Sequence, residues 1–143
     1  MKHLLSLIAI GALAVPATAT AADYRGKTSQ GLRVAAFVKD GRLKLLRIDW
    51  KARCDHNGPW RDRTRWQDKP EGPIQHDGSK FRDGGIEDKR FSDGRVVFNS
   101  KLSGELLEGR IKGKMSVRMK LYTPEGEHVN NCRGTFFFDI PKV

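Results

Sequence analysis

The residues of this chain best suited to binding are arginines and lysines that occupy every second position along short segments. The pattern runs through 42–54, 60–66 and 109–122. A guanidinium holds phosphate, sulfate or carboxylate groups through paired hydrogen bonds, so such rows favour binding to an anionic polymer or surface, such as a cell wall, an acidic glycan or nucleic acid. The predicted binding residues are Arg47, Lys51, Arg53, Arg61, Arg63, Arg65, Lys112, Lys114 and Arg118.

A second interpretation of these rows stays open, in which they are only a solvated outer face that keeps the protein soluble. Like charges directly opposite each other in a sheet are destabilising unless something screens them. A site for single-stranded nucleic acid would also need aromatic residues on the same face as the arginines. Trp50, Trp60 and Trp66 alternate out of phase with the arginines and are predicted to lie in the core.

A carrier for a small apolar ligand is the alternative function. A barrel of about eight strands is just wide enough to hold one small molecule if its interior is not filled. The residues that would then line the pocket are Trp50, Trp60, Trp66, Phe98, Met115, Met119, Phe136 and Phe138.

No catalytic residue, metal ligand or cofactor is predicted. His56, His76 and His128 sit in turn-like contexts without metal-binding spacing, and a disulfide would bring only His56 and perhaps His128 toward one end of the domain, beside Asp55. The acidic residues that could act in hydrolysis are predicted in turns or on outward faces: Asp62, Glu87, Asp88, Glu105 and Glu108. A secreted hydrolase is therefore the weakest alternative, and a non-catalytic protein is favoured over an enzyme.

The elements that would carry these residues are antiparallel strands. Apolar residues recur with a period of two, and Asp40-Gly41 and Asp93-Gly94 are typical of hairpin turns. About eight such strands predict a small all-β domain, an antiparallel up-and-down barrel or alternatively a two-sheet β-sandwich. Residues 67–93 contain prolines and four glycines, and they predict a long loop with a short strand around 79–82.

Cys54 and Cys132, the only cysteines, predict a disulfide. Each alternates in phase with the apolar residues of its own strand, which places both on core-facing positions. A redox or metal role would need a CxxC spacing or nearby ligands, and the sequence around the two cysteines has neither.

Residues 1–22 have the features of a secretory signal peptide: a positive start, an apolar run of about a dozen residues and a small-residue cleavage zone. We expect cleavage near Ala22, a single domain over 23–143, and a secreted or periplasmic protein that is not an integral membrane protein. The leader contributes only the charge of Lys2, so the formal net charge falls from +10 to +9. Such an excess favours attraction to anionic surfaces.

The segment Gly26-Lys27-Thr28-Ser29-Gln30-Gly31 resembles the opening of a group of small secreted bacterial proteins. In that group a strand ends in an R-x-R-x-C-like segment, where this chain has the similar but one residue shorter 51–54 with Lys51 in the first basic position, and a C-x-G-like strand closes the chain, matched by 132–134. The resemblance covers most of the chain except 67–93. It implies a secreted, disulfide-bridged β fold and no particular activity.

Overall fold

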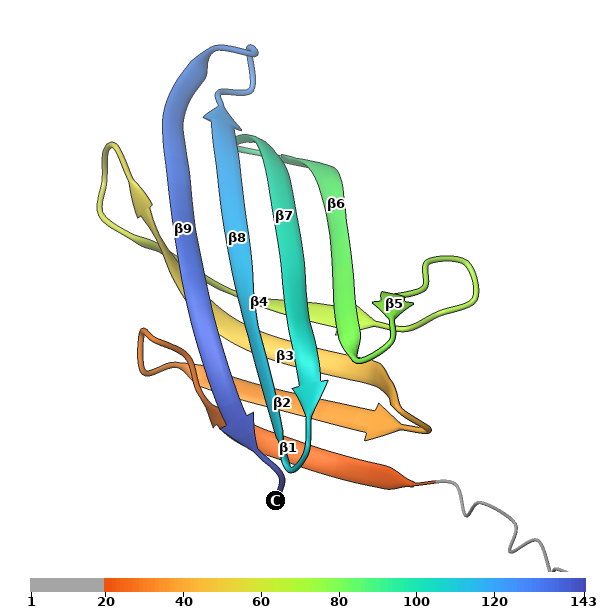
Figure 1. The fold of residues 1–143 in the computed structure, drawn as a ribbon. Helices are drawn as coiled ribbons and strands as arrows, with labels where there is room; N and C mark the ends of the chain where they lie inside the picture. The colour runs from red at the N-terminus through yellow and green to blue at the C-terminus, as the bar shows by residue number, and fades with distance from the viewer. Residues whose placement is uncertain (1–19) are drawn as a thin grey trace, which may run out of the picture.

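The chain folds entirely into β-strands and turns over residues 20–143, the part that the computed structural model describes (Figure 1). The strands are β1 (Ala21–Lys27), β2 (Arg33–Lys39), β3 (Arg42–Cys54), β4 (Trp60–Gln67), β5 (Gln75–Asp77), β6 (Lys80–Phe91), β7 (Gly94–Leu107), β8 (Arg110–Tyr122) and β9 (His128–Pro141). Every pairing between them is antiparallel, which confirms the predicted fold class.

The strands form one sheet in the order β1-β2-β3-β9-β8-β7-β6-β5, with β4 on the other edge of β3. We call β1–β4 the first half and β5–β9 the second half; Figure 1 shows the second half lying across the first. Buried residues of both halves share one hydrophobic core. β3 and β9 join the halves on one side, as in a barrel, while β4 and β6 do not pair, as in a sandwich.

The predicted hairpin at Asp40-Gly41 and the long alternating strands are confirmed. Asp40 and Gly41 have φ angles of 53° and 71°, the left-handed conformation that a tight hairpin turn requires. The inward residues of β3 are fully buried, with Trp50 only 1% exposed. Alternation with a period of two was therefore a sound guide wherever one face of a strand packs on the core.

The predicted long loop over 67–93 is wrong in extent. β6 is one continuous strand from Lys80 to Phe91, paired along its whole length with β7, and β5 precedes it. Most of β6 is exposed to solvent, so its residues lack the apolar alternation that reveals a half-buried strand. β1 and β5 were also missing from the sequence-based expectation, and only residues 68–74 form an irregular connection.

The segment that carries the family resemblance forms a corner between the two halves. Ser29 exchanges hydrogen bonds with the backbone of Phe137 in β9, its N donating at 2.7 Å and its Oγ accepting at 3.1 Å. The Gln30 side chain pairs with the backbone of Lys51, accepting from its N at 3.0 Å and donating to its O at 2.7 Å. The motif therefore has a structural role: it fastens the β1–β2 connection to β9 and β3.

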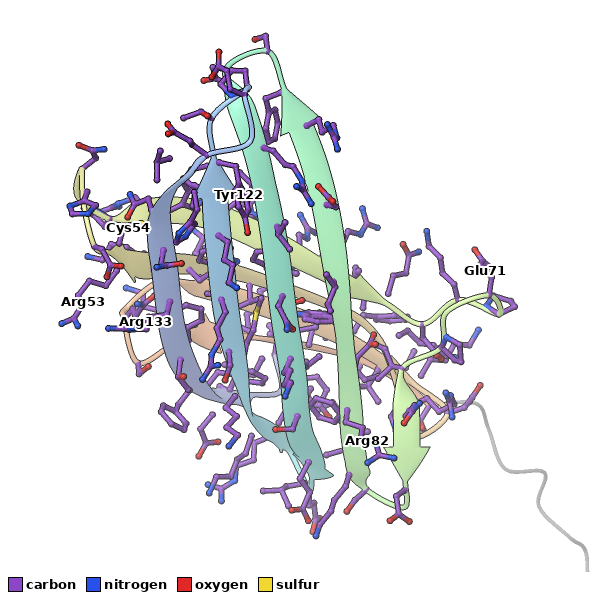
Figure 2. The ribbon with its side chains drawn as sticks, turned by 90° about the horizontal axis from the view of Figure 1, so that it is seen from above. Arg53, Cys54, Glu71, Arg82, Tyr122 and Arg133 are labelled. Atoms are coloured by element: carbon purple, nitrogen blue, oxygen red, sulfur yellow. A yellow bond between two sulfur atoms is a disulfide. The ribbon has the colours of Figure 1, made fainter. Side chains whose placement is uncertain are left out.

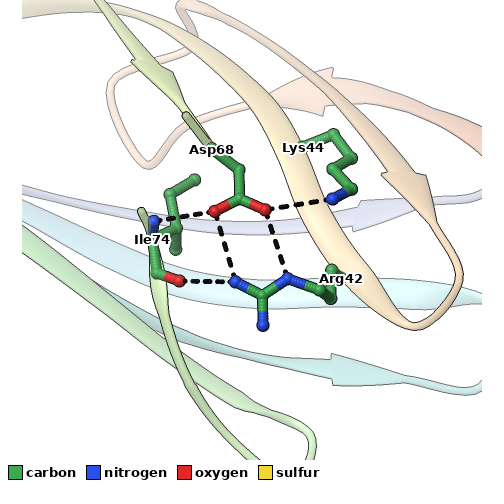
Figure 3. A network of polar contacts seen from close by, with 4 residues as sticks. All are labelled: Arg42, Lys44, Asp68 and Ile74. Carbon is green, nitrogen blue, oxygen red and sulfur yellow. Dashed lines mark hydrogen bonds and ion pairs between the residues drawn. The ribbon is translucent and has the colours of Figure 1, made fainter. Parts of the chain in front are cut away.

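Asp68 holds the irregular connection that follows β4 (Figure 3). Its carboxylate accepts hydrogen bonds from both Arg42 and Lys44 and from the backbone N of Ile74 at 3.0 Å. Arg42 also donates to the Ile74 carbonyl at 3.0 Å. Ile74 is completely buried, so this network holds an apolar side chain in place within the core. The hydrogen bond from Arg42, with those from Lys44 and Ile74, lowers the pKa of Asp68 to about 2.

The predicted disulfide is confirmed. Cys54 and Cys132 are directly opposite each other in β3 and β9, with their Cα atoms 4.0 Å apart and 78 positions separating them in the chain. Cys132 is buried and Cys54 packs against the core. The bridge lies where β3 of the first half pairs with β9 of the second half, at the end of the molecule where Figure 2 labels Cys54.

The predicted signal peptide lies outside the described residues except for Thr20 to Ala22. Ala21 and Ala22 pair with Lys39 and Val38 in β2. Cleavage after Ala19 would leave β1 whole, whereas cleavage after Ala22 would remove two of its paired residues.

Asp68→Asn is expected to lower the free energy of unfolding by about 1–2 kcal/mol at pH 7. The folded-state pKa is depressed from 3.8 to about 2, so the carboxylate stabilises the fold above about pH 4 and loses this effect as the pH falls toward 2. Urea denaturation from pH 7 to pH 2 should show the wild-type and variant curves converging. Glu71→Gln, an exposed change in the same connection, is the control, and a gap that persists at pH 2 would refute this role for Asp68.

Removing the disulfide with Cys54→Ala and Cys132→Ala together is expected to cost about 2–4 kcal/mol of stability, mainly because the unfolded chain regains freedom. Denaturant titration of the double variant against the oxidised wild type measures this cost. Equal midpoints would show that the β3–β9 pairing holds without the bridge.

Candidate anion-binding face

The outward residues of the first half form basic rows that run across its strands. β3 and β4 pair as the predicted site requires, with Arg47 opposite Arg65 and Lys51 opposite Arg61. Arg63 is instead opposite Asp49. The structure therefore brings the predicted residues of β3 and β4 together, with one carboxylate among them.

One of these rows extends over all four strands of the first half. Arg25 of β1 is opposite Ala35 of β2, which is opposite Arg47, which in turn is opposite Arg65. Ala35 has a much shorter side chain than its neighbours in the row. A basic row with a small residue in its middle can receive a ligand group between the guanidinium groups.

A hollow of about 300 Å³ lies at this place on the outer face. Its basic residues come from four neighbouring strands, its two carboxylates are Asp23 and Asp49, and Phe37 and Leu45 add apolar surface. The lining residues are Asp23, Tyr24, Arg25, Arg33, Ala35, Ala36, Phe37, Leu45, Arg47, Asp49 and Arg63. We call this surface the arginine hollow.

The Asp49 carboxylate is engaged by one of these arginines. Arg63 donates to it from both Nε and a terminal nitrogen, the latter at 3.2 Å. The hydrogen bond from Arg63 holds the pKa of Asp49 below its ordinary value against the opposing effect of burial, and the charges of Arg33 and Arg47 act in the same direction as the hydrogen bond. Asp49 therefore stays ionised and offsets Arg63, while Arg25, Arg33 and Arg47 make no ion pair within residues 20–143.

The remaining predicted residues lie on the second half or at the junction. Arg53 is opposite Arg133 in β9, and Arg133 is opposite Arg118 in β8, so basic residues continue around the corner beside the disulfide, where Figure 2 labels Arg53 and Arg133. Lys112 and Lys114 face outward on β8, away from the arginine hollow. Lys112 lies between Glu105 and Asp139 of the adjacent strands.

The prediction that the tryptophans lie away from the arginines is confirmed for Trp50 and Trp66, which are 1% and 7% exposed. Trp60 packs against the core but is only partly buried. The arginine hollow accordingly has no tryptophan in its lining, and Phe37 is the partly exposed aromatic residue there.

The histidines do not form a site. At the disulfide end, His128 Nε2 contacts Asn131 Oδ1 at 2.8 Å, and the His56 backbone is bonded to the Asn130 side chain. His76 was expected in a surface turn, but it lies half-buried in β5 against Phe81, and burial lowers its pKa. Within the described residues, no three His, Cys, Asp or Glu residues are placed to hold a metal ion.

No protein-family model, curated protein or solved structure matches this chain. Between residues 20 and 143 there is also no helix of the length and apolar character needed to cross a membrane. The assignment of a site therefore depends on the geometry of this chain alone.

Sequence analysis missed Arg25 and Arg33, although both carry the same alternation as the predicted residues. Arg25 follows the buried Tyr24, and Arg33 precedes the buried Val34. A period of two places Arg25 outward once 21–27 is recognised as a strand, and it places Arg33 outward in β2 because Val34 is buried.

Asp49→Asn is expected to lower the free energy of unfolding by about 0.5–1 kcal/mol, because Arg63 loses its partner and the neighbouring arginines lose a nearby negative charge. Sulfate at matched ionic strength should restore more of this loss than chloride does, since it can bind between guanidinium groups. Urea denaturation in the two salts measures the effect. Asp88→Asn, which removes the partner of Arg95 on the second half, is the control and should show no such preference for sulfate.

Proposed function

We propose that this protein is a non-catalytic binding protein for an anionic polymer, which it holds on the outer face of its first half. The observation that carries this proposal is the arginine hollow: arginines from adjacent strands surround Ala35, and only Asp23 and Asp49 oppose them. Guanidinium groups in this arrangement can bind sulfate, phosphate or carboxylate groups with two hydrogen bonds each.

A polymer suits this face better than a single small anion. The arginines are exposed, so each contact with an anion is weak and screened by salt. Further basic residues continue from the hollow along β3 and β4 and around the corner at Arg53, Arg133 and Arg118. Many weak contacts to one chain of repeated charges add up to useful affinity with a steep dependence on salt.

A location outside the cytoplasm is part of this proposal. The disulfide between Cys54 and Cys132 supports it, because such bridges form and persist in oxidising compartments. The sequence of residues 1–22 supports it independently. We accordingly propose a periplasmic or secreted protein that meets an anionic component of the envelope or of the surroundings.

The test compares two triple variants that each remove three positive charges. Arg25→Gln, Arg33→Gln and Arg47→Gln alter the arginine hollow, whereas Lys101→Gln, Lys112→Gln and Lys114→Gln alter the outer face of the second half. On a heparin column the first variant should elute at clearly lower salt than the wild type. The slope of log affinity against log salt should become shallower by about 2–3, against a much smaller change for the second variant.

Equal shifts for the two variants would mean that heparin senses only net charge, and the proposed site would then be wrong. Circular dichroism and thermal unfolding of both variants serve as the check that each is folded. Removing like charges should leave the first variant at least as stable as the wild type.

A further inference from the structure

The side of the molecule where the sheet is open contains a second hollow, between β4 and β6. Within the described residues β4 pairs only with β3, and β6 beyond Arg82 pairs only with β7, so two strand edges border this opening. The hollow measures about 230 Å³. Its lining residues are Trp50, Trp60, Asp62, Arg63, Thr64, Arg65, Glu87, Lys89, Phe91, Val96, Phe98 and Met119. We call it the seam hollow.

Aromatic residues form the deep part of the seam hollow. The rings of Trp50 and Phe98 stack with centroids 5.7 Å apart and planes inclined by 14°. Trp60 lies beside them at the start of β4, and its Nε1 is buried without a hydrogen-bond partner in the protein. This nitrogen has almost no accessible surface, so Trp60 offers a ligand its ring and no hydrogen-bond donor.

Polar side chains form the rim of the seam hollow. Asp62 and Thr64 share the core-facing side of β4 with Trp60, and Thr64 Oγ1 accepts a hydrogen bond from Trp50 Nε1 at 2.8 Å. Glu87 is opposite the core residue Phe98, and its carboxylate is 3.1 Å from Lys89 Nζ. The expectation that Asp62 and Glu87 lie in turns or face outward is therefore wrong, because both line this hollow.

The aromatic deep part and the polar rim together favour one class of ligand for the seam hollow. A purely apolar ligand would cover the Asp62 carboxylate and the Glu87–Lys89 ion pair with apolar surface, and a polyanion would meet two carboxylates. A sugar ring satisfies both parts, because its C–H faces pack on aromatic rings while its hydroxyl groups donate to carboxylates and accept from Lys89 Nζ. The volume is below the range typical of drug-sized sites and suits a single ring.

The two hollows lie on opposite faces of β4 and share one lining residue. Arg63 lines both of them. Along β4, the odd-numbered residues face the basic outer surface and the even-numbered residues face the seam hollow. A polymer chain that places its acidic groups on the arginines can therefore pass over the edge of β4 and insert one ring.

From this shared border we infer that the polymer bound by the protein is an acidic polysaccharide, one of whose sugar rings occupies the seam hollow. The inference rests on the proposed function and narrows it to one class of polymer. Inorganic polyphosphate, which has no ring, would use the arginines alone.

The experiment measures binding of a sulfated heparin hexasaccharide and of inorganic polyphosphate by isothermal titration calorimetry at one salt concentration. Asp62→Asn and Glu87→Gln each remove a negative charge, so electrostatics alone would tighten the binding of both probes. We expect them to weaken hexasaccharide binding by about tenfold, as for the loss of a hydrogen bond to a charged group, and not to weaken polyphosphate binding. Glu125→Gln, an equal change of charge in the exposed β8–β9 turn, should weaken neither.

The outcomes separate this inference from the proposed function. If Asp62→Asn and Glu87→Gln leave hexasaccharide binding unchanged or tighter, no ring occupies the seam hollow. If Arg47→Gln weakens both probes in that same experiment, the arginine hollow stands as a general polyanion site. If the hexasaccharide does not bind but polyphosphate binds through Arg47, this inference fails and the proposed function stands. If Arg47→Gln weakens the binding of neither probe, or neither probe binds, the proposed function fails and this inference fails with it. Asp62 and Glu87 are exposed, so the variants should fold, and their thermal unfolding checks this.

Discussion

The fold depends on β3 serving both halves of the sheet. Along one edge β3 pairs first with β2; then the Gln30 side chain takes the place of a strand at Lys51; and finally β9 pairs at Arg53 and Cys54. The amide of Gln30 offers the same donor and acceptor as a backbone peptide unit, so the edge of β3 stays bonded while its partner strand changes. The disulfide then holds the strands together where the two halves meet.

This arrangement makes the molecule asymmetric, and both candidate sites follow from the asymmetry. On the side of β3 and β9 the halves are bonded to each other, with bridges at Tyr24–Lys142 and Thr28–Phe138 adding to the junction. On the opposite side β4 has no second partner strand, and the seam hollow opens there. Because β4 has the core on one face and solvent on the other, it presents the seam hollow on its inner side and arginines on its outer side.

The sequence was sufficient where one face of a strand is buried, since the alternation then identifies both the strand and its outward residues. β3, β8 and the disulfide between Cys54 and Cys132 are of this kind. It found β6 only in part, as a short strand around 79–82 within a loop, because β6 is exposed nearly throughout and shows little alternation. It failed for the seam hollow, because the presence of Asp62 and Glu87 in one lining depends on how two distant strands are placed, and no local pattern records that. Arg25 was missed because β1 was not recognised, whereas Arg33 begins the strand before the predicted Asp40-Gly41 hairpin and was overlooked.

The placement of the acidic residues argues against an interpretation of the basic face as a means to solubility alone. In the first half, the Asp68 carboxylate accepts hydrogen bonds from Arg42, Lys44 and the backbone of the buried Ile74. The Asp49 carboxylate accepts hydrogen bonds from Arg63. On the second half, Arg95 and Arg110 are matched in the same way by Asp88 and Asp139, while Arg25, Arg33 and Arg47 make no ion pair among residues 20–143. A net charge keeps a protein soluble wherever it is placed. Solubility therefore gives no reason to set Arg47 directly opposite Arg65 at a cost in stability, whereas a bound anion would relieve that repulsion.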